Sequence, residues 1–208
     1  MLAQREQRRC VMNYKKIIKD HIYKSKGVLL SEDISSKSVP SIYLTRMVEK
    51  GVIQRVERGV YISKHGSYDE YYFFQKRYKS AIFSYLSALY LHKLTDVVPN
   101  AIEVTLYRGY NPHRMNVDII KHYVTRDMHT LGVMDCETMY GNVVKVYDLE
   151  RIICDIVKNR KSVDSELFSK TLNNYVRSPK KDFAKLYEYA RQLKIFDKVK
   201  EILEVIYE

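Results

Sequence analysis

The chain has 208 residues, of which 46% are hydrophobic, and a formal net charge of +11. Gly and Pro are few and no repeat or biased segment occurs, which excludes a disordered or low-complexity chain. No apolar run approaches the ~20 residues of a membrane span, so we expect no membrane association. The three cysteines, Cys10, Cys136 and Cys154, are odd in number and lack CxxC spacing, which argues against a disulfide framework and favours a cytoplasmic location.

Most of the positive charge lies in the first third of the chain. Residues 1–66 contain 14 Lys and Arg against 6 Asp and Glu, whereas residues 67–208 contain 22 against 19. A basic module followed by a nearly balanced body is typical of a DNA-binding domain joined to a domain of another kind. Residues 1–12 are basic but lack the apolar segment of a signal peptide, so we separate them as an N-terminal extension, within which Met12 offers an alternative start.

Residues 13–66 predict a winged helix-turn-helix domain. Apolar and aromatic side chains recur at helical spacing over 13–25, and Gly27 is expected to end this first helix. Residues 28–30 are expected to form a short apolar link. A short second helix then begins at Ser31.

A third helix and a hairpin complete this domain. Ser38 is expected to cap the helix, with Pro40 in its first turn, where a missing N–H costs nothing, and Gly51 is expected to end it. Two alternating runs, 52–56 and 60–62, flank a turn that contains Gly and predict a β-hairpin. Three helices followed by a hairpin is the element order of a winged helix.

Residues 67–208 predict a mixed α/β domain with a small sheet and a helical tail, which makes the whole chain α+β. We expect helix from 68 to 94 in two pieces, with the almost entirely apolar segment 80–91 buried on several faces. A loop at 95–99 follows. Alternating runs predict strands within 101–107, 117–125 and 132–147. Four further helices are expected: one that Asp148 caps and that runs through Lys158, and three at 165–176, 182–193 and 195–207.

The third helix of the basic domain divides into an apolar and a polar face. Leu44, Met47 and Val48 share one face and are expected to pack inward together with Val52 and Ile53. The opposite face carries Ile42, Thr45, Arg46 and Glu49, with Ser41 at its flank. A helix that reads DNA needs this division, because short polar groups and a long donor must reach base edges in the major groove.

Within that face, Ile42 is expected to contact a thymine methyl group, and Arg46 a guanine or a phosphate. Arg55 and Arg58 lie on the hairpin, which would place them against the DNA backbone or the minor groove. The predicted DNA-contacting residues are Ser38, Ser41, Ile42, Thr45, Arg46, Arg55 and Arg58. For the lysines of the first helix, contact with phosphate and a merely solvated surface both stay open, the second being the more frequent outcome for any one lysine.

Catalytic and metal-binding motifs are missing from the sequence. It contains no HExxH, GxSxG, P-loop or GxGxxG pattern, so we expect no enzyme, no metal and no cofactor. Cys136 and Cys154 are interpreted as buried structural cysteines. Arg151 and Asp155 stand four residues apart at a helix start, a spacing that indicates a local ion pair rather than acid–base chemistry.

One polar cluster leaves an alternative function open. Arg108, His113 and Arg114 surround a loop at 109–112 and are the convergent polar groups that a small-molecule pocket would need. The alternative is therefore a winged-helix repressor that responds to a ligand bound by its C-terminal domain. A loop in solvent explains the same residues equally well.

The order of features resembles the AbiEi family, the antitoxins of the AbiE abortive-infection (type IV) toxin–antitoxin systems. The matching pieces are LTRMVEKGVIQRVERGVYI (44–62), AIFSYLSALYLHKL (81–94) and VKVYDLERIICDIVKNR (144–160), followed by a helical tail. The resemblance covers nearly all of the chain except residues 1–12. Its first piece is shared with many regulators, whereas YDLERIICDIV following SALYLHKL at this distance is much more specific.

This resemblance implies both a fold and a role. It implies an N-terminal winged helix that represses its own operon by binding operator repeats in double-stranded DNA. It also implies a C-terminal α/β domain that counteracts a nucleotidyltransferase-class toxin without a stable complex, as part of phage defence by abortive infection. The DNA role falls on the outward residues of the third helix and on the hairpin.

The antitoxin role has weaker candidates, all basic residues of the helical tail: Lys180, Lys181, Lys185, Arg191 and Lys194. A solvated helix face is the favoured interpretation of these residues. The sequence has no long heptad repeat for dimerisation, and a single winged helix reads only a short half-site. We therefore expect a monomer that pairs on DNA.

Overall fold

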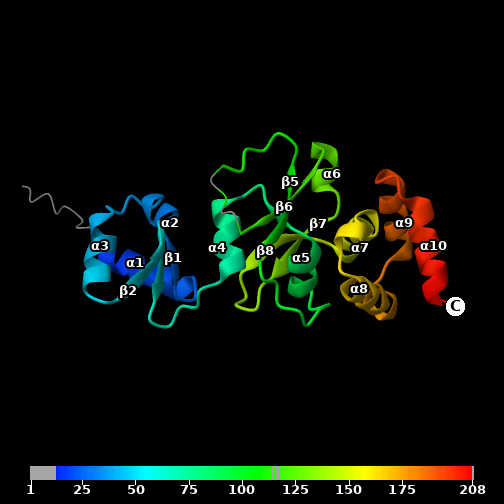
Figure 1. Cartoon of the computed structure of the whole chain (residues 1–208). Coiled ribbons are helices and arrows are strands. Elements are labelled where there is room, and N and C mark those ends of the chain that lie inside the picture. Colours follow the sequence, from blue (N-terminus) through cyan, green and yellow to red (C-terminus); the bar gives the residue numbers. More distant parts are fainter. Residues whose placement is uncertain (1–12, 114, 116–117, 208) are drawn as a thin grey trace, which may run out of the picture. The chain divides into compact units, whose positions relative to one another are not determined.

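The computed structural model describes residues 13–113, 115 and 118–207 and divides between Tyr68 and Asp69 into two compact units (Figure 1). The expected extension at 1–12, Arg114 and the first residue of the strand expected at 117–125 lie outside the described residues. Among the described helices, none has the length and apolar character needed to cross a bilayer.

Unit 1, up to Tyr68, is built from three helices and a three-stranded antiparallel sheet. Its elements are α1 (Tyr14–Lys24), β1 (Val28–Leu30), α2 (Ser31–Ser35), α3 (Ile42–Glu49), β2 (Ile53–Glu57) and β3 (Val60–Ser63). The strands lie in the order β1-β3-β2, so the predicted β2–β3 hairpin is confirmed. The core joins all of these layers through Ile18, Leu29, Ile34, Leu44, Met47 and Ile53.

The expected apolar link at 28–30 is instead the strand β1. Its register with β3 pairs Val28 with Ile62 and Leu30 with Val60, and all three β1 side chains are buried. The segment shows no alternation because both of its faces are covered, and a run of three apolar residues carries no periodic signal of its own. Its backbone groups are paired by β3, which lies thirty residues later in the chain.

Ser38 does not cap α3, contrary to the sequence prediction. Its φ of 56° is left-handed, and its N–H donates to the Ser35 carbonyl oxygen (2.9 Å), so it closes the turn after α2. Ser41 occupies the N-cap position of α3 without a side-chain capping bond. The reason lies in Val39, because a residue before proline is pushed into extended backbone and therefore could not continue a helix begun at Ser38.

Unit 2, from Asp69 onwards, holds a five-stranded mixed sheet and a helical tail. Its first part comprises α4 (Glu70–Arg77), β4 (Ile82–Phe83), α5 (Tyr85–Leu91), β5 (Glu103–Tyr107), β6 (Ile120–Val124) and α6 (Arg126–Thr130). Its second part comprises β7 (Val133–Glu137), β8 (Val143–Tyr147), α7 (Leu149–Lys158), the 3-10 turn η1 (Arg160–Ser162), α8 (Ser165–Arg177), α9 (Phe183–Gln192) and α10 (Phe196–Tyr207). The strand order is β6-β5-β4-β8-β7.

The helix expected across 80–91 is interrupted by β4 at the centre of this sheet. Ile82 pairs with Thr105 of β5, and Phe83 pairs with Val104 of β5 on one side and Val146 of β8 on the other. A segment that is apolar on every face fits a buried strand and a buried helix equally, so its two-residue strand depends on partners from β5 and β8. The short helix α6 is a second element absent from the sequence prediction.

Helix α7 connects the two apolar cores of unit 2. Ile152 and Ile156 pack into the core of the sheet, whereas Ile153, Cys154 and Val157 pack with the helical tail. Asp148 caps the helix as predicted, since its side chain accepts a hydrogen bond from the Arg151 N–H (2.9 Å). Burial on both sides explains why apolar residues occupy more than one face of this helix.

Candidate nucleic-acid interface

The outer face of α3 is open to solvent, as the helical wheel predicts. Ser41, Thr45, Arg46 and Glu49 are all exposed, and Ile42 exposes 48% of its surface even though it is a large apolar residue. The opposite face is packed, with Leu44 and Met47 buried in the core of unit 1. This helix therefore offers a surface of mixed polar and apolar character that the described residues leave exposed.

Val52 is a correction to the predicted inward face, because it lies at the surface rather than in the core. The N–H of Gly51 donates to the Val48 carbonyl oxygen (2.9 Å), and that of Val52 to the Met47 carbonyl oxygen (3.0 Å). These two bonds, with Gly51 at φ 64°, form the Schellman motif that ends a helix. The motif turns the chain, so Val52 leaves the apolar face and Ile53 enters the core.

A basic hollow of about 340 Å³ lies between α1 and α3. Its lining consists of Lys15, Tyr43, Arg46, Met47 and Lys50, three of which are cations and none of which is acidic. The Arg46 guanidinium lies 5.7 Å from the centre of the Tyr43 ring. A hollow of this size and charge can accept a phosphate group.

Sequence reasoning missed two residues of this hollow, Tyr43 and Lys50. The four-residue spacing between Arg46 and Lys50 was visible in the sequence and would place them on one side of the helix. The contribution of Lys15 depends on how α1 packs against α3, and no local pattern encodes it. Lys15, Arg46 and Lys50 form no ion pair with any residue that the structure describes in the chain.

The hairpin holds its two arginines at its surface. Arg55 and Arg58 are exposed, and the Arg55 Nε donates to the Glu57 carbonyl oxygen (3.2 Å) next to a register shift in the β2–β3 pairing. The turn is fixed to the start of α2, because the Ser31 N–H donates to the Gly59 carbonyl oxygen (2.8 Å). Arg58 therefore stands at a tip that is anchored and not a freely moving loop.

One histidine of unit 1 has a perturbed pKa. The pKa of His21 is lowered, first by burial and then by Lys37, whose Nζ lies 2.8 Å from the Nδ1 of His21. Asp33 lies 3.4 Å from the other ring nitrogen and acts in the opposite sense. His21 is thus favoured in its neutral form, and the positive charge of unit 1 comes from Lys and Arg.

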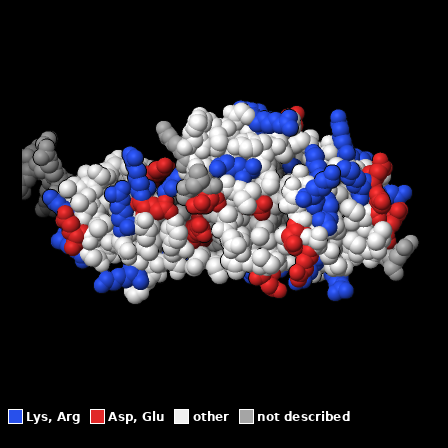
Figure 2. Space-filling model, in the orientation of Figure 1, with Lys and Arg blue, Asp and Glu red and all other residues white. Residues whose placement is uncertain are grey.

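The candidate antitoxin residues of unit 2 differ from one another in their surroundings. Figure 2 shows Lys and Arg side chains gathered over the helical tail on the face drawn. Lys185 is held by Asp148 (2.8 Å) and lies 3.8 Å from Glu150, so it belongs to the packing around the start of α7. Arg191 lies over the Phe196 ring, whereas Lys180 and Lys194 are exposed and form no ion pair with described residues.

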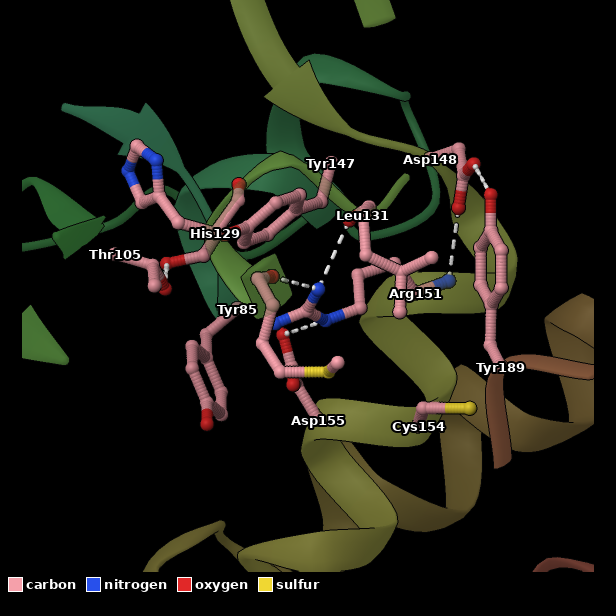
Figure 3. A network of polar contacts seen from close by, with 12 residues as sticks. Tyr85, Thr105, His129, Leu131, Tyr147, Asp148, Arg151, Cys154, Asp155 and Tyr189 are labelled. Carbon is pink, nitrogen blue, oxygen red and sulfur yellow. Dashed lines mark hydrogen bonds and ion pairs between the residues drawn. The ribbon is translucent and has the colours of Figure 1, made fainter. Parts of the chain in front are cut away.

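Arg151 and Asp155 form the expected ion pair, but inside the protein and not at its surface. Figure 3 shows Arg151 among Leu131 of the α6–β7 connection, Tyr147 of β8 and Asp155 of α7. Its Nε lies 3.0 Å from Asp155 Oδ2, its Nη1 donates to the carbonyl oxygens of Met128 (2.6 Å) and Leu131 (2.9 Å), and it stacks on the Tyr147 ring. Burial raises the pKa of Asp155, and the adjacent Arg151 guanidinium partly opposes this shift by favouring the charged carboxylate. The pair fastens the α6–β7 connection to α7.

The polar cluster around the loop at 109–112, which suggested a small-molecule pocket, is exposed to solvent in the part that the structure describes. Arg108 and His113 are both exposed, and Arg114 lies outside the described residues. The His113 N–H donates to the Asn111 side chain (3.0 Å), a local turn bond. The two described members thus fit the interpretation of a loop in solvent.

Comparison with known proteins bears on unit 1. Residues 16–64, from α1 to just beyond β3, match the family model described as "Transcriptional regulator, AbiEi antitoxin". This is an antitoxin and transcriptional-regulator family. The match stops before unit 2, so it does not extend to the YDLERIICDIV segment on which the resemblance also depended. No curated protein matches the chain.

Among solved structures, the chain is similar to the RV2827C protein from Mycobacterium tuberculosis. The similarity has a TM-score of 0.50 at 10% sequence identity and covers 88% of this chain and 76% of that one. At so low an identity the similarity concerns the fold alone. It reaches beyond unit 1 and therefore includes much of the sheet and tail of unit 2.

Proposed function

We propose that unit 1 is a winged helix that binds double-stranded DNA, and that the chain is an autorepressor acting on operator repeats of its own promoter. The observation that carries this proposal is the exposed outer face of α3, beside which Lys15, Arg46 and Lys50 form no ion pair with residues that the structure describes. Cations that no described carboxylate neutralises are available to phosphates, whose neutralisation supplies most of the affinity of such domains.

In this proposal α3 enters the major groove and the hairpin lies beside it. Ile42, Thr45 and Arg46 would reach base edges, while Ser38 and Ser41 would lie at the entry to the groove. Arg55 and Arg58 would contact the backbone or the minor groove from the anchored β2–β3 turn. The elements that hold these residues in place all lie within unit 1, which supports our proposal that residues 13–66 are the DNA-binding domain.

The short length of α3 supports the expectation that two copies act on DNA. Its eight residues span about 12 Å at the usual rise per residue, enough for a few base pairs. Repeated half-sites bound by two chains would supply the affinity that one helix lacks. We therefore propose a chain that is monomeric when free and paired on operator repeats.

We further propose that residues 67–208 act as an antitoxin in the cytoplasm. The description of the matching family supports this role, and the separate core of unit 2 gives it a structural basis apart from DNA binding. The partner would be a nucleotidyltransferase-like toxin that is counteracted without a stable complex, as in abortive-infection phage defence. The basic residues of the tail remain candidates for this activity.

The DNA part of the proposal is tested by titrating the full chain onto its own upstream region. Arg46→Ala and Arg58→Ala should each weaken binding, and the loss of a base contact typically costs ~1–3 kcal/mol. Arg108→Ala is the matched control, because it removes an exposed arginine from unit 2. Equal binding by the Arg46 and Arg58 variants and the control would place the DNA-binding surface elsewhere.

The antitoxin part has its own test, co-expression with the neighbouring gene. The neighbour alone should arrest growth, and the full chain should restore it, as should the Arg46→Ala variant, whose DNA binding is weakened. A neighbour that is harmless by itself would end the antitoxin proposal and leave DNA binding untouched.

A further inference from the structure

Unit 2 contains a second hollow, of about 780 Å³, whose lining includes none of the candidate DNA-binding or antitoxin residues. It lies between the end of α7, the η1 turn, α8 and α10. Both α8 and α10 pack against α7, and residues of both helices line the hollow. A hollow of this volume has the size of a binding site.

The floor of this hollow is apolar. It is formed by Val157, Phe168, Leu172, Ile202, Val205 and Ile206. Val205 exposes 71% of its surface, and Ile202 and Ile206 are only partly buried. The stripe on α10 thus continues past the core of unit 2 onto a surface that the described part of the chain leaves uncovered. A contiguous exposed apolar surface of this kind is typical of an interaction site.

The rim of the hollow is basic. Lys158, Lys161, Lys198 and Arg160 line it, against a single acid, Glu201. Arg160 is held in place, since it donates to the Val163 carbonyl oxygen and the Ser165 hydroxyl and lies over the Phe168 ring. The three lysines are exposed and form no ion pair with residues that the structure describes. An occupant with negative charge along its edges would complement this rim.

The geometry also favours a helical occupant over an extended one. The lining residues belong to helices and to the η1 turn, so a strand would find no backbone edge with which to pair. Residues 198 to 206 of α10 run along the hollow for about 12 Å, roughly two helical turns. This length matches apolar anchors at positions i, i+3 or i+4, and i+7 of an amphipathic helix.

We propose that this hollow is a docking groove for an amphipathic helix of a partner protein, with an apolar stripe and acidic flanks. The apolar stripe contacts Val205, Ile202 and the floor, and the acidic flanks pair with Lys158, Lys161 and Lys198. The proposal does not depend on DNA binding by unit 1, and each can fail without the other.

The probe for the test is a fluorescent synthetic peptide about four helical turns long, with Leu along one stripe and Glu on both flanks. Its binding to the full chain is measured by anisotropy at low salt. One control peptide carries Lys in place of every Glu. A second has the same composition with the leucines scattered around the helix. We expect binding of the first peptide alone, weakening as salt is added.

Variants of the chain then locate the site. Val205→Asp changes a residue that is already exposed, so folding is retained, and it should weaken peptide binding about tenfold. The combined variant Lys158→Glu, Lys161→Glu and Lys198→Glu should weaken it by about tenfold or more. Its matched control is Lys93→Glu, Lys180→Glu and Lys194→Glu, which makes the same change in charge at exposed lysines outside the hollow. This control should bind within about twofold of wild type.

Several outcomes would overturn the proposal. Equal binding of the acidic and basic peptides would show that charge plays no part. Equal binding of the acidic peptide and the peptide with scattered leucines would show that no apolar stripe docks in a groove. Self-association of the full chain that Val205→Asp abolishes would make the occupant a second copy. Binding of decanoate in place of the peptide would make the hollow a site for a small amphiphile.

Discussion

Gly59 and Ser31 approach each other so closely that a Cβ on Gly59 would fall 2.7 Å from the Ser31 hydroxyl oxygen. Gly59 also has a φ of 81°, which L side chains rarely adopt. This contact ties the tip of the β2–β3 hairpin to the first residue of α2. The position of Arg58 thus depends on a glycine that has two independent reasons to be there.

Replacement of Gly59 should therefore cost more than replacement of another glycine with similar backbone. Gly59→Ala should lower the free energy of unfolding by about 2 kcal/mol, because it adds a steric clash to backbone strain. Gly51→Ala is the control, since Gly51 has a φ of 64° but nothing within 4 Å of an added Cβ, and should cost about 1 kcal/mol. Urea unfolding followed by circular dichroism measures both. Identical losses would mean that Ser31 simply moves aside.

The basic hollow beside α3 predicts a non-specific component of DNA binding. Lys50→Ala should weaken binding to operator and to unrelated duplex alike, and should reduce the slope of log affinity against log salt by about 0.9, because one phosphate contact is lost. The measurement is a salt titration of binding with both duplexes. Lys194→Ala in unit 2 should leave the slope unchanged. A loss confined to the operator would instead make Lys50 a base-reading residue.

Because Ser38 does not cap α3, its replacement should have only a small effect on stability. Ser38→Ala should change the free energy of unfolding by less than about 0.5 kcal/mol, because its side chain caps no helix. Asp182→Ala provides the contrast, since the Asp182 side chain accepts the Lys185 N–H at 3.0 Å and its loss should cost about 1 kcal/mol. Urea midpoints of the two variants decide the matter. A loss of about 1 kcal/mol at Ser38 would restore the capping role expected from the sequence.

Removing one member of the buried ion pair should severely destabilise unit 2. Arg151→Met leaves the Asp155 carboxylate buried without its partner, which typically costs about 3–5 kcal/mol. Combining it with Asp155→Leu should recover much of this loss, because no unpaired charge then remains. Urea unfolding of the single and double variants gives the comparison. A double variant as unstable as the single one would show that the carbonyl contacts of Arg151, and not its charge, hold the α6–β7 connection.

The lowered pKa values of three histidines predict that the protein loses stability in mild acid. Burial lowers the pKa of His21, His92 and His129 below the ordinary value of 6.5. The unfolded chain therefore takes up these protons first, so the stability is complete above pH 6.5 and is lost as the pH falls through the folded pKa values. Burial raises the pKa of Asp155, and this shift acts on stability in the opposite sense to the three histidines.

The measurement is Tm as a function of pH between about 7.5 and 5.5, a window above the titration of ordinary carboxyl groups. The wild type should melt at lower temperature as the pH falls, and His129→Gln should show a shallower dependence. His129 is a suitable target because its Nε2 is buried without a hydrogen-bond partner among the described residues. A Tm that rises towards acid pH would contradict the assignment.

Much of the fold follows from local patterns in the sequence. Asn13, Asp148 and Asp182 cap α1, α7 and α9 as short polar residues do, and the tail helices begin and end within two residues of their predicted limits. The exposed face of α3 was likewise predictable, because a period of 3.6 residues separates Thr45 and Arg46 from Leu44 and Met47. Helix periodicity and capping are properties of neighbouring residues, so they can be read from the chain by itself.

The tertiary structure decided the features that depend on distant partners. Residues 28–30 and 82–83 are strands only because β3, β5 and β8 satisfy their backbone hydrogen bonds, and runs of two or three apolar residues carry no period. Whether Arg151 would be buried or exposed was equally undetermined, since carbonyl groups of the α6–β7 connection enclose it. The hollows beside α3 and α10 arise from the angles at which helices pack. Such angles depend on side-chain contacts across the core, which no local pattern encodes.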